Sequence, residues 1–163
     1  MDDRGRQTAD CLPFLGNQMS SSLPAIGITA RVAGPVRWVA GAPCLPLGFP
    51  PGSPAPEGPV AGRYFLARCA EETEGERTDW QIYLRRPLYA VQQRGEEWLL
   101  HLPPDDDPGH TWLRRRADGE SVHLLGPFGN GFSLRDESHN LLLLADLTDN
   151  PGGLALLAGL IEP

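Results

Sequence analysis

A glycine-rich stretch near the C-terminal third of the chain has the residue types that can hold a phosphate-bearing ligand. Residues 124–132 read LLGPFGNGF, with three glycines and one asparagine among four large apolar side chains. Each glycine weakens a core strand, so the segment indicates a sharp bend or a close approach of the backbone to another group. Backbone N–H groups in a glycine turn can bind phosphate oxygens, because no Cβ blocks the approach.

A second segment, residues 84–91, reads LRRPLYAV and places two arginines before an apolar run. An arginine in such a position can form a charge-assisted, bidentate contact with a phosphate. The alternative is that Arg85-Arg86-Pro87 is a solvated turn between two strands. In the same way, LLGPFGNGF can be a tight connection whose phenylalanines fill the end of a barrel. The residue types alone leave these alternatives open.

The other polar clusters do not predict a catalytic centre. The four histidines form no Ser–His–Asp or HExxH pattern, so we interpret them as solvated or core residues. They are His101, His110, His123 and His139. The aspartates at 105–107 are typical of an acidic loop, because their spacing is not that of an EF-hand. The arginines at 114–116 suit the polar face of a short helix, or a contact with an adenosine phosphate or an acidic partner.

Composition and charge exclude several classes of protein. A chain of 163 residues suits one ordinary domain, and its formal charge of −7 disfavours wholesale binding of nucleic acid phosphates. Cys11, Cys44 and Cys69 lie far apart without a CxxC pair, so we expect reduced thiols and no zinc or iron–sulfur site made by this chain alone. No apolar stretch reaches the ~18 residues of a membrane span, and the N-terminus lacks the order of a signal peptide. We therefore expect a soluble, cytoplasmic protein without a membrane span.

Short strand-like runs separated by turn signals predict a β-rich fold. Glycine (19) and proline (17) are frequent, which favours many turns over a helical bundle. Residues 1–24 are mostly polar and predict a flexible arm. Residues 41–59 are rich in proline and glycine and predict a long loop, since proline cannot donate to a strand ladder. Strand-like runs occupy 26–33, 36–40, 63–70, 80–93 (as two runs), 96–102 and 121–126.

The C-terminal part has a different pattern. Residues 140–146 read NLLLLAD, a continuous apolar run typical of a strand buried on both faces, and residues 152–161 predict a short apolar helix. A further one or two helical turns are predicted near 110–117. We expect an all-β, six-stranded antiparallel Greek-key barrel over 25–138, followed over 139–163 by the truncated first β–α unit of a nucleotide-binding domain.

Three blocks, in this order, resemble one family. The first block, LRRPLYAV, is similar to an Arg-Pro-x-Ser motif. The second, GHTWLRRRADGESVHLLGPFGNGF (109–132), is similar to the succession Gly-x-Gly-Thr, Trp-Leu and Gly-Pro-Leu-Gly-Asn-Gly-Phe. The third, NLLLLAD with GGLALLAGL, occupies the place of the first strand and helix of a nicotinamide-binding domain. The chain from about residue 28 to 161 resembles the flavin-binding half of ferredoxin reductase-type proteins. Within that family it looks most like the electron-transfer subunit of the two-subunit dihydroorotate dehydrogenases.

The resemblance implies FAD as a cofactor and assigns roles to eight residues. Arg86 would contact a phosphate, and Gly129, Asn130 and Gly131 would contact the pyrophosphate or the ribityl chain. Tyr89, which follows Pro87 and Leu88, would lie near the flavin ring. Thr111 would form a hydrogen bond with the cofactor.

The chain also departs from the family pattern. Tyr89 stands where the family has a serine, and the acidic PPDDDP run precedes the motif that begins at Gly109. Asp146 and Asp149 stand where the family has a glycine-rich nucleotide loop, and a carboxylate there repels phosphate. The remaining strands of that domain and the cysteine-rich tail are not in this sequence. We therefore expect no NAD(P) and no [2Fe–2S] cluster on this chain.

Two functional hypotheses follow from the resemblance. In the first, the chain is a flavoprotein electron-transfer component, oxidoreductase-like when FAD is bound, that works with partner chains in a redox complex or as a homo-oligomer. In the second, it is a degenerate flavin-domain homologue that has lost its cofactor and serves as a structural or adaptor subunit of a larger complex.

Overall fold

The computed structural model of the chain describes residues 26–53, 60–70, 84–132, 140, 142–144 and 152–161. The predicted arm at 1–24 lies outside the described residues, as do Cys11, His139, Asp146 and Asp149.

The described residues form seven strands and two helices, in the order β1, β2, β3, β4, β5, β6, α1, β7 and α2. The strands are β1 (Ile26–Val32), β2 (Arg37–Val39), β3 (Ala42–Gly48), β4 (Tyr64–Ala67), β5 (Arg86–Arg94), β6 (Glu97–His101) and β7 (Ser121–Phe128). The helices are α1 (Pro108–Arg114) and α2 (Gly152–Ile161). Neither of these helices is long and apolar enough to cross a membrane.

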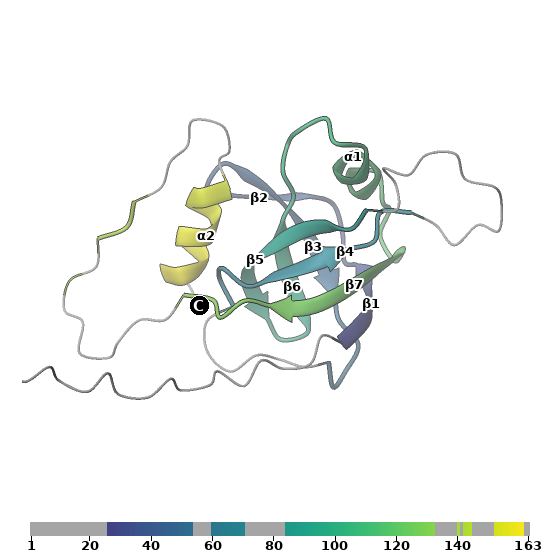
Figure 1. Cartoon of the computed structure of the whole chain (residues 1–163), viewed down its shortest axis with the longest axis horizontal. Helices are drawn as coiled ribbons and strands as arrows, with labels where there is room; N and C mark the ends of the chain where they lie inside the picture. Colours follow the sequence, from purple (N-terminus) through teal and green to yellow (C-terminus); the bar gives the residue numbers. More distant parts are fainter. Residues whose placement is uncertain are drawn as a thin grey trace, which may run out of the picture.

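Six of the strands close into an antiparallel barrel. The order β1-β7-β4-β5-β6-β3 is closed by pairing of β1 with β3, while β2 is an extra strand that pairs with β3 alone. The last strand, β7, returns to lie beside β4, which gives the order β7-β4-β5-β6 of a Greek key. The predicted six-stranded antiparallel barrel is therefore confirmed. Figure 1 shows the barrel between the two helices, with α2 on its left and α1 above it.

The prediction that residues 41–59 form a loop is wrong over Ala42–Gly48, which is β3, a central strand. Two prolines lie within it. The carbonyl oxygen of Pro43 accepts from the N–H of Leu102, one residue beyond the end of β6, and that of Pro46 accepts from Ala33, one residue beyond the end of β1. In an antiparallel strand the N–H and C=O of one residue face the same side. The N–H group that each proline lacks would therefore point to a place where the neighbouring strand, β6 or β1, has just ended. The missing donors interrupt no hydrogen bonds within the sheet.

Alternate residues of the strands fill the barrel with large apolar side chains. Phe65 on β4 is fully buried, and its ring lies 5.2 Å from the Trp98 ring and 5.3 Å from the Phe49 ring. Leu88 on β5 and Leu100 on β6 are also fully buried in this cluster. Because neighbours along a strand point to opposite faces, the residues on either side of Leu88 face outward or lie near the surface.

The helix predicted near 110–117 is present as α1, but it begins and ends earlier. Asp107 caps its N-terminus, with Oδ1 accepting from the N–H groups of Gly109 and His110, and Pro108 occupies the first turn. Asp followed by Pro is a typical helix start, because the aspartate satisfies free N–H groups and proline needs none. The turn after α1 ends at Gly119, whose φ is 82°.

The second helix covers part of the outer surface of the barrel. The prediction of a helix over 152–161 is confirmed by α2. It packs on small side chains of β3, β5 and β6, and a Cβ at Gly159 would overlap the carbonyl oxygen of Val91. The apolar cluster under the helix consists of Ala42, Cys44, Val91, Leu99 and Ala155, with Val39 and Leu156 packed against it.

The strand predicted at 140–146 is not formed by the described part of that segment. Residues 142–144 are not in a strand, and the side chains of Leu142 and Leu144 are 81% and 83% exposed. The expectation of a strand buried on both faces is therefore wrong for these residues. An apolar run is buried as a strand only when neighbouring strands accept it, and the described sheet offers 142–144 no pairing partner.

Candidate functional site

Three aromatic side chains lie in register across β5, β4 and β7. Tyr64 on β4 pairs with Tyr89 on β5 and with Phe128 on β7. The ring centroids of Tyr64 and Tyr89 are 5.6 Å apart, and those of Tyr64 and Phe128 are 5.4 Å apart. Tyr89 is 42% exposed, and its neighbour Leu88 points into the core, so the rings lie on the outer face of the barrel. We call Tyr64, Tyr89 and Phe128 the aromatic row.

The glycine turn follows β7 directly and lies beside the aromatic row. Gly129 and Gly131 have φ values of 78° and 67°, in the left-handed region that side chains rarely adopt. A Cβ at Gly129 would lie 3.6 Å from the Tyr64 ring, so the turn borders that ring. Asn130 between them is exposed. The exposed Phe132 continues the apolar surface, with its ring against Gly62.

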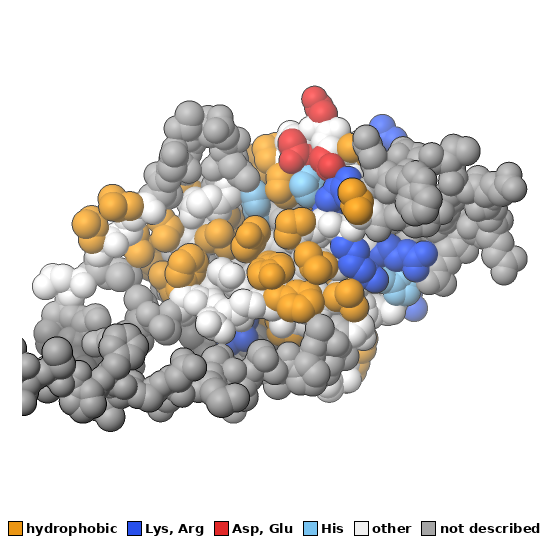
Figure 2. Space-filling model, in the orientation of Figure 1, with side chains coloured by type: hydrophobic (Ala, Val, Ile, Leu, Met, Phe, Trp, Pro, Cys, Tyr) orange, Lys and Arg blue, Asp and Glu red, His pale blue; other side chains and the backbone are white. Residues whose placement is uncertain are grey.

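Figure 2 shows this face of the molecule, with apolar side chains gathered over β5, β4 and β7 and basic side chains beside them. Acidic side chains gather near the start of α1. An exposed group of aromatic rings bordered by backbone N–H groups is suited to stacking against a flat ligand.

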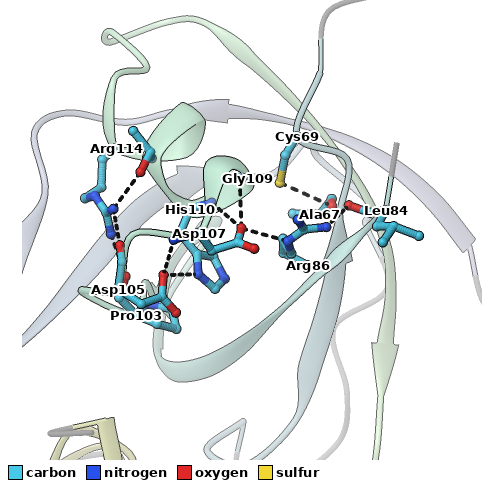
Figure 3. Close-up of polar contacts among 11 residues, drawn as sticks. Ala67, Cys69, Leu84, Arg86, Pro103, Asp105, Asp107, Gly109, His110 and Arg114 are labelled. Atoms are coloured by element: carbon cyan, nitrogen blue, oxygen red, sulfur yellow. Dashed lines mark hydrogen bonds and ion pairs between the residues drawn. The ribbon is translucent and has the colours of Figure 1, made fainter. Parts of the chain in front are cut away.

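Arg86, the predicted phosphate contact, lies at the beginning of β5 and is engaged by protein atoms. Its Nε donates to Oδ1 of Asp107 at 2.7 Å, and its Nη1 donates to the carbonyl oxygen of Leu84 at 2.6 Å (Figure 3). The side chain of Arg86 is only 12% exposed. The guanidinium therefore ties the start of β5 to the start of α1.

Asp107 is the centre of this polar group. Its Oδ1 accepts from Arg86 and from the N–H groups of Gly109 at 2.8 Å and His110 at 3.1 Å. The hydrogen bond from Arg86, aided by these backbone donors, lowers the pKa of the Asp107 carboxyl to about 2. Asp107 therefore stays ionised throughout the physiological range. Burial raises the pKa of the nearby Cys69 thiol to about 11, so this cysteine is an inert core residue.

The depressed pKa of Asp107 predicts a loss of stability in acid. A carboxyl with a lowered pKa in the folded state contributes stability above its ordinary pKa of 3.8, which is lost as the pH falls towards about 2. We expect Asp107→Asn, which keeps the acceptor and loses the charge, to remove about 1–2 kcal/mol of this acid dependence. Thermal denaturation between pH 5 and 2 measures it. The exposed Asp106→Asn is the matched control, and equal slopes for the two variants would contradict the assignment.

The remaining predicted residues are divided between these places. Thr111 lies on α1, where its Oγ1 accepts from Arg114 Nη2 at 2.9 Å. Arg114 also donates to the carbonyl oxygen of Pro103 at 2.7 Å, so Thr111 belongs to the network that holds the 103–107 loop on α1. Pro87 is exposed beside β4, and the side chain of Leu88 is fully buried in the core. Leu88 can therefore contact an outer ligand only through its backbone.

The structure thus brings the predicted residues into two groups rather than one. Tyr89 lies with the glycine turn, and Arg86 lies with α1. Arg86 and Tyr89 are three residues apart on β5, a separation of about 10 Å along an extended strand. An odd separation also directs their side chains to opposite faces of the strand, so a single small anion cannot reach both groups.

Sequence reasoning missed three residues of this site. Tyr64 was placed in a predicted strand without a functional role, and Phe128 was assigned only within the glycine stretch. Asp107 was interpreted as part of a solvated loop, although Asp-Pro at 107–108 is a helix-start signal that marks it as a cap. The pairing of Tyr64 with Tyr89 depends on strand register, which a single sequence does not give.

Metal ligands are not clustered in the part of the chain that the structure describes: no group of three or more His, Cys, Asp or Glu side chains there could hold an ion.

Comparisons with known proteins add no assignment, because no protein-family model and no curated protein matches the chain.

Proposed function

We propose that this chain is an FAD-binding component of an electron-transfer system, with a barrel of the ferredoxin reductase type, that works with partner chains. The observation that carries the proposal is the aromatic row on the outer face of β4, β5 and β7, in which Tyr89 is exposed and Tyr64 and Phe128 are half-buried, bordered by a glycine turn. A flavin supplies the redox chemistry when it is bound, and the protein supplies its binding site and orientation.

The residues present fit the ring of a flavin, at the aromatic row, more fully than its diphosphate, at Arg86. The flat ring would stack on Tyr89, the exposed ring of the row, beside the Tyr64 ring, which is tilted by 47° from it. The backbone of the 129–131 turn would meet the ribityl chain or the diphosphate. Arg86 lies about 10 Å from Tyr89 along β5. Its guanidinium would contact the end of the diphosphate away from the glycine turn, shared between that group and Asp107.

The test is a flavin-loading titration of the full chain. Protein is titrated into FAD, FMN or riboflavin at fixed salt, and flavin fluorescence and absorbance are followed. We expect saturable binding of FAD at tens of micromolar or below and weaker binding of riboflavin, which has the ring without a phosphate. If neither FAD nor FMN binds at tens of micromolar, the flavin proposal fails.

A second candidate, the barrel without a cofactor that serves as a structural or adaptor subunit, is favoured by the Arg86–Asp107 contact. The Asp107 carboxylate already accepts from Nε of Arg86, one of the guanidinium donors that a phosphate would use. The chain's own carboxylate therefore competes with a bound anion for the same donor.

Removal of that carboxylate charge separates the two candidates. Asp107→Asn keeps the cap of α1 but no longer repels a diphosphate or holds Arg86 by charge. If the protein binds flavin, we expect Asp107→Asn to tighten FAD binding about three- to tenfold, or about 1 kcal/mol, in the same titration. Binding of FAD by Asp107→Asn and not by the natural chain would support the cofactor-free barrel.

A further inference from the structure

His101 lies at the junction of the barrel with both helices. It is the last residue of β6, it is 3% exposed, and it pairs with Cys44 on β3. Its ring lies directly under the first residue of α2, because a Cβ at Gly152 would lie 2.7 Å from Nδ1 and 2.8 Å from Nε2. Only a glycine leaves room for the imidazole at this position. His101 therefore forms part of the surface on which α2 rests.

Within the part of the chain that the structure describes, little offsets a positive charge on the imidazole of His101. Its Nε2 is buried and has no hydrogen-bond partner within the described residues. The N-terminus of α2 above it carries the positive end of the helix dipole, and the sequence of α2, GGLALLAGLI, contains no charged side chain. A protonated His101 would therefore be a buried cation that faces the positive end of a helix.

Among the described residues, the titratable groups around His101 are His110, Cys44 and Asp105. His110 on α1 is 7% exposed, and its Nδ1 lies 2.7 Å from Oδ1 of Asp105. Cys44 faces His101 from β3, and burial raises the pKa of its thiol to about 12, so it stays neutral. Asp105 is the one group among these that favours a positive charge on His101, and it is already engaged by His110 and is half exposed.

The apolar contact between α2 and the barrel involves few side chains, so protonation of one buried group is enough to change its stability. The apolar cluster under the helix is made mainly of Ala42, Cys44, Val91, Leu99 and Ala155. None of these side chains is larger than leucine. A buried charge that lacks a partner costs several kcal/mol, which is comparable with burial of two or three such side chains.

We propose that His101 is a pH-sensitive latch: protonation of its imidazole in mildly acidic solution releases α2 from the barrel and uncovers Cys44 on β3. Burial first, and then the neighbouring His110, lowers the pKa of His101 below its ordinary value of 6.5. A histidine with a lowered pKa contributes stability above 6.5, and this contribution is lost as the pH falls below that value. The docked helix is thus favoured at neutral pH and weakened in acid.

The latch does not depend on flavin binding, because His101, Cys44 and the cluster under α2 include no residue of the aromatic row. Val91 under α2 and Tyr89 of the row lie two residues apart on the outer face of β5.

The test follows the reaction of Cys44 with a pyridyl disulfide, a reagent that modifies thiols at acidic pH. The full chain is labelled at pH 7.5 and pH 5, the rates are normalised to glutathione under the same conditions, and each cysteine is quantified by peptide mass spectrometry. Cys69 is 1% exposed in the barrel core and does not contact α2, so it reports global unfolding. We expect Cys44 to react at least tenfold faster at pH 5 while Cys69 stays protected.

Variants identify the group that titrates. His101→Gln and, as a second neutral replacement, His101→Phe are each expected to abolish the pH dependence of Cys44. Gly159→Ala, which pushes α2 off Val91, is expected to expose Cys44 at both pH values. The latch is refuted if Cys44 is equally protected at pH 5 and pH 7.5, if Cys44 and Cys69 become reactive together, or if the pH dependence persists in a folded His101 variant.

Discussion

Replacement of Arg86 by alanine is expected to weaken FAD binding about ten- to a hundredfold. A charge-assisted hydrogen bond contributes about 1.5–3 kcal/mol, and its loss corresponds to such a change in the dissociation constant. The guanidinium is only 12% exposed and is held by Asp107 and by the carbonyl oxygen of Leu84, so it is already fixed in place before a ligand arrives. An ordered donor loses little entropy when it binds a phosphate. Flavin fluorescence against protein concentration, at fixed salt, measures the effect.

Arg115→Ala is the matched control for this variant. Arg115 is an exposed residue at the C-cap of α1. Its replacement removes the same charge as Arg86→Ala, from the same region, without changing a residue of the proposed site. We expect its affinity for FAD to be unchanged. The cap of α1 should survive in Arg86→Ala, because Asp107 still accepts from Gly109 and His110. An Arg86→Ala protein that binds FAD as tightly as the natural chain would mean that the diphosphate lies elsewhere.

Much of the barrel was predictable because its strands are short β-prone runs bounded by turn signals. β6 follows the turn at Gly95, and β7 follows the turn at Gly119. Such turn residues mark where a strand begins without knowledge of its neighbours. The short helix α2 was also predicted, because GGLALLAGLI follows the turn residues Asn150 and Pro151 and is rich in alanine and leucine, which favour helix.

The errors occurred where the outcome depends on neighbours. Pro43 and Pro46 are acceptable in β3 only because β6 and β1 end beside them, and no local signal reports where another strand ends. The leucines at 142–144 were expected to be buried because they are apolar, yet burial requires a surface to receive them. Local patterns therefore defined the elements, and the pairing of distant segments decided their roles.

For the candidate site too, the individual residues could be proposed from the sequence, but the contacts between them could not. The resemblance implied roles for the glycine turn and Arg86. The sequence did not show that Asp107 accepts a hydrogen bond from the Arg86 guanidinium, because that contact joins β5 to the start of α1 across 21 residues. The assembly of the aromatic row likewise depends on the register of β4 against both β5 and β7. Register is set by the whole sheet, so the aromatic row that supports the flavin proposal became visible only in three dimensions.

Replacement of Gly129 by valine is expected to weaken FAD binding at least tenfold. Its φ of 78° is strained for any residue with a Cβ and most of all for a β-branched one, at a cost of about 1–3 kcal/mol. The new Cβ would also lie 3.6 Å from the Tyr64 ring, so the branched methyl groups would cover the surface on which a flat ligand stacks. The variant therefore acts by steric exclusion, whereas Arg86→Ala acts by loss of charge.

Gly52→Val separates this local effect from general backbone strain. Gly52 has the same φ of 78°, and no atom lies within 4 Å of its Cβ position. The Gly52 turn follows β3, which ends opposite Arg31, near the C-terminal end of β1. The glycine turn follows β7, which reaches Ile26 at the N-terminal end of β1. The two turns therefore lie at opposite ends of β1. We expect both variants to lower the thermal midpoint to a similar extent and Gly129→Val alone to lose FAD affinity. Equal affinity in the two variants would show that the turn at 129–131 does not border the flavin, because both carry the same backbone strain.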